Sequence, residues 1–204
     1  MLFQLRRPNG RATNKRRRAA SRGQTLAEFA LVFPLFVLLL TAIIEFALIF
    51  NAVLAINFAS RDASLVAAEA GDEGQADCEI LDQIEHSILP PANPGLISTV
   101  KIYRVSTGGT AAETSVWNRG GSTTCLMPNG ITSITVPYGK GAQNYPPGTR
   151  CPRLAGCFGR TTIDQVGVEI TYQYSSHTPI GDFFTKNGGA TLIKANVMRM
   201  EPVL

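Results

Sequence analysis

The feature that most constrains this chain is a long apolar run directly after a strongly basic N-terminal segment. Phe29 to Phe50 supplies 22 residues, of which only Glu45 is charged. At 1.5 Å per residue, a helix of this length covers about 33 Å, enough to cross the hydrocarbon core of a membrane. The sequence therefore predicts one transmembrane helix near the N-terminus, with a domain of ordinary size built from the residues that follow it.

The first 23 residues carry the positive charge of the chain. They contain eight arginine and lysine residues and no acid, and since the whole chain has a net charge of +4, the remaining residues carry −4. Basic residues before an apolar helix stay on the cytoplasmic side under the positive-inside rule. We interpret residues 1–23 as a cytoplasmic leader without a fold of its own. We expect no binding of nucleic acid, because no basic face with interleaved aromatic residues follows the leader.

Helical signals continue well beyond the apolar run. Thr25, with Glu28 three residues later, matches a capping box, and Gly71 suits a C-terminal cap. These signals predict one helix from Thr25 to Ala70, about 69 Å long. That is more than twice the length that membrane anchoring needs.

Three features of this helix bear on its role. Pro34 removes a backbone donor inside the span and predicts a local kink. Glu45 lies near the outer end of the span, where the simplest interpretation is a side chain that reaches the membrane interface. The third feature is a stripe of small residues at three- and four-residue spacing: Ala52, Ala55, Ala59, Ala63 and Ala67. Two explanations of the stripe stay open, namely packing against helices of other subunits and packing against the sheet of the chain's own outer domain.

All four cysteines follow the apolar run. If the basic end stays inside, Cys78, Cys125, Cys151 and Cys157 lie outside, where disulfides form. No CxxC spacing or nearby histidine suggests zinc, so we expect no metal site. Four cysteines allow three pairings, and the short loop favours Cys151–Cys157, which leaves Cys78–Cys125.

The remaining residues predict an α+β domain with a mainly antiparallel sheet. Apolar periodicity predicts a short helix over 78–89, stopped by two prolines, and strands over 96–106, 131–136, 165–176 and 190–200. The clearest strand places Val166, Val168, Ile170, Tyr172 and Tyr174 on one face. The glycine- and serine-rich segments 107–130 and 137–160 are interpreted as long loops. The predicted domain organisation is a leader at 1–23, a helix at 24–70 and an outer domain at 71–204.

The most informative motif is Arg22-Gly23-Gln24-Thr25-Leu26-Ala27-Glu28-Phe29. It resembles the processing site of type IV prepilins and pseudopilins. Together with Ala30-Leu31-Val32-Phe33-Pro34 and Ile44-Glu45-Phe46, it is similar to the TadE-like family of the tight-adherence (Flp) pilus machinery. The segment 195–202 also resembles the end of such proteins.

The resemblance implies a role for each of these residues. Gly23 is the scissile residue for a prepilin peptidase, since a small residue lets catalytic groups approach the backbone. Gln24 becomes the new N-terminus, and Glu28, followed by Phe29, pairs with the N-terminal ammonium of a neighbouring subunit. Pro34, Glu45, Ala52, Ala55 and Ala59 belong to the helix that enters an assembly. The implied partners are the membrane, the prepilin peptidase, other pilins or pseudopilins and the assembly platform.

No pattern in the chain predicts an enzyme. Its two histidines are isolated, with His86 expected to be solvated and His177 expected in a turn, and no nucleophile elbow, phosphate loop or zinc motif is present. We expect no cofactor. The only tryptophan, Trp117, is expected to anchor a core.

The sequence therefore predicts a minor pilin or pseudopilin that takes part in pilus assembly, adhesion or secretion. It is expected to be a single-pass protein of the cell membrane with a cytoplasmic N-terminus and an outer C-terminal domain, or a part of the surface pilus after processing. Two alternatives stay open: a bitopic component of the assembly machine that never enters the filament, and a membrane-tethered binding domain.

Overall fold

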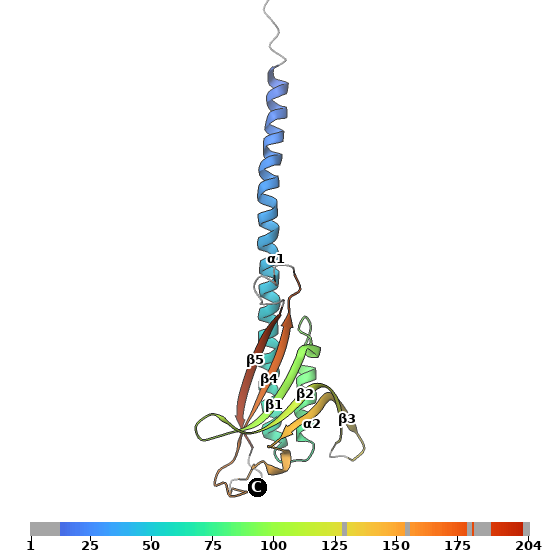
Figure 1. Cartoon of the computed structure of the whole chain (residues 1–204), viewed down its shortest axis with the longest axis vertical. Helices are drawn as coiled ribbons and strands as arrows, with labels where there is room; N and C mark the ends of the chain where they lie inside the picture. Colours follow the sequence, from blue (N-terminus) through green and yellow to red (C-terminus); the bar gives the residue numbers. More distant parts are fainter. Residues whose placement is uncertain (1–12, 128–129, 154–155, 179–180, 182–188, 202–204) are drawn as a thin grey trace, which may run out of the picture. The chain divides into compact units, whose positions relative to one another are not determined.

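The computed structural model describes residues 13–127, 130–153, 156–178, 181 and 189–201, with side chains from Gly23 onward. The helices are α1 (Thr13–Ala70) and α2 (Ala76–Ser87), with short 3-10 turns at Pro94–Leu96 and Pro147–Thr149. The strands are β1 (Ile97–Val105), β2 (Ala111–Leu126), β3 (Ser133–Gln143), β4 (Gln165–Ser175) and β5 (Gly189–Arg199) (Figure 1). The fold is α+β, as predicted. The chain divides into two compact units, the first ending at Ile44 and the second beginning at Glu45.

Helix α1 begins earlier than the sequence predicted. It starts at Thr13, so Thr25 lies inside the helix and does not cap it, and the prediction of a leader without structure is wrong from Thr13 onward. Residues 13–22 are rich in lysine, arginine and alanine, which favour the helix, and extension of an existing helix adds one hydrogen bond per residue. The predicted end is confirmed: α1 stops at Ala70, and Gly71 follows with a φ of 57°, the left-handed conformation of a glycine cap.

A five-stranded antiparallel sheet forms the frame of the second unit. Its strand order is β3-β2-β1-β4-β5, so β3 and β5 are the edges. Strand β4 pairs with β5 over its whole length without a shift in register. The predicted inward face of β4 is confirmed, since all five of its members are buried: Val166, Val168, Ile170, Tyr172 and Tyr174.

The outer part of α1 packs against this sheet, and the alanine stripe makes the contact. Ala52, Ala59 and Ala63 are between 0 and 2% exposed and belong to one core with the strands, and Ala67 is equally buried. The hydroxyl of Ser60, on the same side of the helix, donates to the carbonyl of Val168 in β4 at 2.7 Å. Of the two explanations for the stripe, the structure therefore supports packing against the chain's own sheet. Ala55 is only half buried, at the margin of this contact.

The two segments interpreted as loops contain regular strands, so those predictions are wrong in part. Strand β2 occupies most of 107–130, and β3 extends well past Val136. Their glycines suggested loops, yet the sheet uses two of them: a Cβ on Gly121 would collide with the backbone of Gly139, so only glycine permits the strands to approach there. The five threonines of the segment 107–130 suit a pleated surface.

Candidate functional site

The predicted processing residues lie together on α1, in the first unit. Gly23, Gln24, Glu28 and Phe29 are all exposed. The side-chain amide of Gln24 donates to the Glu28 carboxylate at 3.1 Å. A Cβ placed on Gly23 would meet no atom within 4 Å. The fold of the first unit therefore places no steric demand for glycine at position 23.

The first unit presents an almost continuous apolar surface. Large apolar side chains that are 39 to 80% exposed cover it from Leu26 to Ile44, and Pro34 lies inside the helix. The hydroxyl of Thr41 donates to the carbonyls of Val37 and Leu38, which satisfies it within the helix. Helix α1 is thus long and apolar enough to cross a membrane by length and composition.

Glu45 is the first residue of the second unit, and the structure corrects its predicted environment. Its side chain is 0% exposed, so the interpretation as a side chain reaching the membrane interface is wrong. The carboxylate accepts the hydroxyl of Tyr174 at 2.7 Å and the backbone amides of Thr178 at 3.0 Å and His177 at 3.3 Å. We name this arrangement the Glu45 socket. A buried carboxylate is tolerated only when donors replace the water it loses, and the socket supplies three.

The backbone after β4 is shaped to form the socket. The amide of Gly181 donates back to the Thr178 carbonyl at 2.9 Å. A Cβ on Gly181 would lie 2.8 Å from the Glu45 carboxyl carbon and closer still to Ser176. A side chain at position 181 would therefore force the backbone of this residue away from the Glu45 carboxylate.

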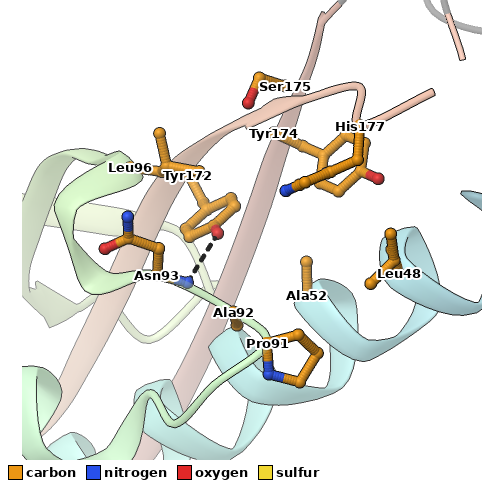
Figure 2. A pocket seen from close by; sticks show the side chains of 10 residues that line it. All are labelled: Leu48, Ala52, Pro91, Ala92, Asn93, Leu96, Tyr172, Tyr174, Ser175 and His177. Carbon is orange, nitrogen blue, oxygen red and sulfur yellow. Dashed lines mark hydrogen bonds between the residues drawn. The ribbon is translucent and has the colours of Figure 1, made fainter. Parts of the chain in front are cut away.

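A cavity of about 250 Å³ adjoins the socket (Figure 2). Its walls come from α1, from the loop after α2 and from the end of β4: Leu48, Ala52, Pro91, Ala92, Asn93, Leu96, Tyr172, Tyr174, Ser175 and His177. The Tyr172 hydroxyl accepts the Asn93 backbone amide at 3.2 Å. His177, which was predicted to lie in a turn, lines this cavity together with Tyr172 and Tyr174.

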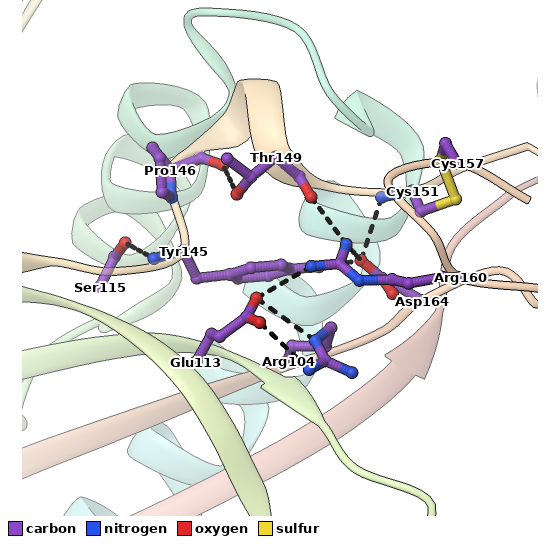
Figure 3. A network of polar contacts seen from close by, with 10 residues as sticks. All are labelled: Arg104, Glu113, Ser115, Tyr145, Pro146, Thr149, Cys151, Cys157, Arg160 and Asp164. Carbon is purple, nitrogen blue, oxygen red and sulfur yellow. Dashed lines mark hydrogen bonds and ion pairs between the residues drawn. A yellow bond between two sulfur atoms is a disulfide. The ribbon is translucent and has the colours of Figure 1, made fainter.

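A polar network ties the segment 145–164 to the sheet (Figure 3). Arg160 donates to Glu113 at 2.9 Å and to Asp164 at 2.8 Å, and Arg104 donates to Glu113 at 3.2 Å. Asp164 also accepts the hydroxyl of Tyr145 at 2.9 Å. Burial raises the pKa of Tyr145, and the Asp164 carboxylate raises it further. Because each of the two carboxylates accepts from more than one donor, the network holds the segment in place against the sheet.

Two disulfides hold the second unit together. Cys78 of α2 is bonded to Cys125 of β2, and Cys151 is bonded to Cys157, which is the pairing that the spacing favoured. The amide of Cys151 donates to Asp164 at 3.0 Å, so the short disulfide loop and the polar network share an anchor. Within the described ranges, no cluster of three or more histidine, cysteine, aspartate or glutamate side chains could hold a metal ion.

Several residues of the second unit escaped the sequence analysis. Tyr174 and Thr178 complete the Glu45 socket, and no sequence signal connects them to an acid more than 125 positions earlier. Arg150 is fully buried and paired with Asp77, although an arginine in a proline- and glycine-rich segment suggests a solvated loop. Trp117 is 2% exposed, as predicted for a core anchor, and His86 is largely exposed, as also predicted.

Comparison with known proteins finds a match to a protein family. The model of the family described as TadE-like protein matches residues 23–65, which is 43 of the 204 residues. No curated protein and no solved structure matches the chain. The matched range contains the predicted processing residues, the apolar span, Glu45 and the first four alanines of the stripe. Proteins of the TadE-like family are structural components of the tight-adherence pilus system. The match therefore indicates a pilus-associated chain with membrane association and pilin partners. The resemblance carried by the N-terminal motif is confirmed by this match, and we name residues 23–65, which the family model matches, the TadE-like segment.

Proposed function

We propose that this chain is a minor pilin or pseudopilin of a tight-adherence pilus, which a prepilin peptidase cuts between Gly23 and Gln24. The observation that carries the proposal is the TadE-like segment, in which the Gly23 to Phe29 motif heads a long apolar helix. After cleavage, Gln24 would carry a free ammonium. In this proposal the exposed Glu28 carboxylate accepts the ammonium of a neighbouring subunit, and this ion pair is stronger than its present bond to the neutral amide of Gln24.

The conformation around Gly23 suits a cleavage site. The residue lies within α1, where glycine destabilises the helix by about 1 kcal/mol relative to alanine. A peptidase needs an unwound backbone, and glycine makes this stretch the easiest to unwind. Since a side chain at position 23 would meet nothing in the folded chain, the requirement for glycine is assigned to the peptidase.

The membrane-crossing part is proposed to end at Ile44. Leu26 to Ile44 spans about 29 Å as a helix, close to the thickness of the hydrocarbon core. Glu45 begins the second unit and is already covered by it. This boundary is six residues earlier than the predicted end at Phe50. The basic leader then stays in the cytoplasm and the second unit lies outside, where its disulfides can persist.

A second apolar surface on α1 is the proposed assembly face. Away from the buried alanine stripe, α1 has large apolar side chains that are 38 to 63% exposed, and most of them are spaced by four residues. We name this set the outer strip: Phe46, Phe50, Leu54, Phe58 and Leu65. Four-residue spacing keeps side chains on one side of a helix. With the membrane ending at Ile44, lipid does not cover this strip. Exposed apolar patches of this kind mark contacts with other proteins, here helices of neighbouring subunits and the assembly platform.

Mass spectrometry of the membrane-extracted protein tests the proposal. In a host with an active prepilin peptidase, the chain should begin at Gln24, and Gly23→Leu should leave it at full length. Gly148→Leu is a matched control, because a side chain there also meets nothing within 4 Å and the position is far from the cleavage site in sequence. A mature chain that still begins at Met1 in that host would contradict the proposal. Absence of the processed chain from sheared filaments would favour a membrane-resident component of the assembly machine.

A further inference from the structure

A second cavity, of about 150 Å³, lies at the N-terminus of α2 and is separate from the Glu45 socket. Residues from the start of α2, from β2 and β3 and from the following turn line it: Gly74, Asp77, Cys78, Trp117, Cys125, Lys140, Gln143, Pro146 and Pro147. We name it the Trp117 cavity. It is too small for a drug-sized ligand but several times larger than one water molecule, which occupies about 30 Å³ in the liquid.

The lining of this cavity contains a buried donor with nothing to bind. Trp117 is 2% exposed, and its indole Nε1–H has no hydrogen-bond partner among the described residues. A buried donor left without an acceptor costs about 1–3 kcal/mol. In the same lining, the side-chain amide nitrogen of Gln143 donates to the Val116 carbonyl at 3.0 Å, and the indole donates neither to the Gln143 oxygen nor to any other described acceptor. An acceptor from outside the chain could therefore bind to the indole Nε1–H and remove this cost.

One positive charge, that of Lys140, lies next to the same space. The Lys140 ammonium lies 5.8 Å from the centre of the Trp117 ring, held there by direct cross-strand pairing of the two residues. None of the ion pairs among the described residues includes Lys140. Asp77 is the one acid of the lining, and it is already paired with the fully buried Arg150. Lys140, whose side chain is exposed, is therefore the charged residue of the lining that no ion pair among the described residues compensates.

Two further features add to this preference for an anion. Helix α2 begins at Ala76 without a side-chain cap, and Asp77 and Cys78 of its first turn line the cavity, so the positive end of the helix dipole is close. Behind Asp77, the Nε and Nη1 donors of Arg150 also have no partner among the described residues. Three buried donor groups of Trp117 and Arg150 therefore lack an acceptor among the described residues.

We propose that the Trp117 cavity binds a small carboxylate, which accepts from the indole Nε1–H and pairs with the Lys140 ammonium. One uncompensated positive charge matches a monoanion better than a phosphate dianion. The prolines and the disulfide in the lining provide apolar contact for a short organic body next to the carboxylate. This inference is independent of the proposed pilus role, since it uses no residue of the TadE-like segment.

The chain contains a single tryptophan, so its intrinsic fluorescence reports directly on this cavity. The full chain in detergent is titrated with sodium propionate, with sodium chloride at equal ionic strength as the reference. We expect a saturable change with propionate and none with chloride. Lys140→Met should weaken the propionate affinity by about tenfold, as expected for loss of one charge-assisted contact. Lys194→Met, a lysine of β5 outside the lining, should leave the affinity unchanged.

Two more titrations identify the source of the carboxylate. N-acetylglycine carries the carboxylate of a peptide C-terminus, and N-acetylaspartate amide carries that of an acidic side chain. Saturable binding of N-acetylglycine or N-acetylaspartate amide supports the proposal and indicates that a protein partner supplies the carboxylate. Binding of propionate alone supports the proposal and indicates a free organic acid. No saturable change with any carboxylate, stronger binding of phosphate than of propionate, or an unchanged affinity in Lys140→Met would overturn the proposal.

Discussion

Glu45 binds three donors in the second unit, and its replacement tests the socket at the scale of one residue. Glu45→Gln presents an NH₂ group and a single acceptor oxygen to a hydroxyl and two backbone amides. We expect a loss of about 1.5–3 kcal/mol in the free energy of unfolding, because hydrogen bonds to a charged group are lost and buried donors remain. Chemical denaturation of the chain in detergent, followed by far-UV circular dichroism, measures this loss. Glu69→Gln is the control, since Glu69 is exposed on the same helix, and an equal loss there would contradict the socket's role.

The tyrosines give a prediction for alkaline pH. Burial raises the pKa of Tyr103, Tyr138, Tyr145 and Tyr174 in the folded chain, and neighbouring carboxylates raise it further. A group whose pKa is higher in the folded state holds its proton more tightly there, so the stability it contributes is present below the unfolded pKa of about 10 and is lost as pH rises above it. We expect these tyrosines to ionise together with unfolding. Absorbance near 295 nm and circular dichroism should therefore change in one step, and ionisation well before unfolding would contradict the burial.

At the scale of the helix, the alanine stripe and the outer strip make opposite predictions. Ala59 is 0% exposed beneath the sheet, so Ala59→Leu overpacks the core and should lower the free energy of unfolding by about 1–3 kcal/mol. Ala47→Leu adds the same side chain on the exposed side of α1 and should change stability by less than about 0.5 kcal/mol. Thermal melting of both variants in the same detergent measures the difference. Equal melting temperatures of Ala59→Leu and Ala47→Leu would contradict packing of the stripe against the sheet and would favour its role in assembly.

The outer strip should be needed for assembly and dispensable for folding. Phe50 and Phe58 are 63% and 53% exposed, so the double variant Phe50→Asn, Phe58→Asn removes little packing within the chain. We expect its melting temperature to stay near that of the unchanged chain, whereas crosslinking to partner helices in the membrane should be lost. Asn57→Gln, also on the exposed side of α1, is the control for crosslinking. Crosslinking that survives the double variant would exclude the strip as the assembly face.

How far the sequence predicted these elements depends on whether the pattern of each was local. The apolar span, the glycine cap at Gly71 and the alternation of β4 are each encoded within one short stretch of sequence, and the structure agrees with them. Strand β2 lacked such a pattern, since the need for glycine at Gly121 comes from Gly139 across the sheet and not from a neighbour in sequence. The candidate site divides in the same way. The motif at Gly23 could be found in one stretch of eight residues, whereas the partners of Glu45 and the donors around Trp117 come from distant segments.

At the scale of the whole molecule, the two disulfides should differ in their contribution to stability. Cys78–Cys125 closes a loop with a sequence separation of 47, and Cys151–Cys157 closes one of 6. In the loop-entropy description, the first contributes about 4 kcal/mol and the second about 2 kcal/mol. Replacing each pair by serines and measuring chemical denaturation of the second unit should show this order. A larger loss for the 151–157 pair would mean that its link to the Asp164 network outweighs loop entropy.

The Glu45 socket also has a consequence for the synthesis of the chain, because Glu45 is made well before the residues that donate to it. Its donors are encoded 129 to 133 positions after the carboxylate. At a synthesis rate of 5–20 residues per second, the acid waits roughly 6 to 26 s between its own incorporation and that of Tyr174. During this interval the nascent helix carries an unsatisfied carboxylate next to an apolar segment. A chain that stalls or is truncated before β4 cannot bury this acid, which distinguishes an unfinished product from a complete one at the membrane surface.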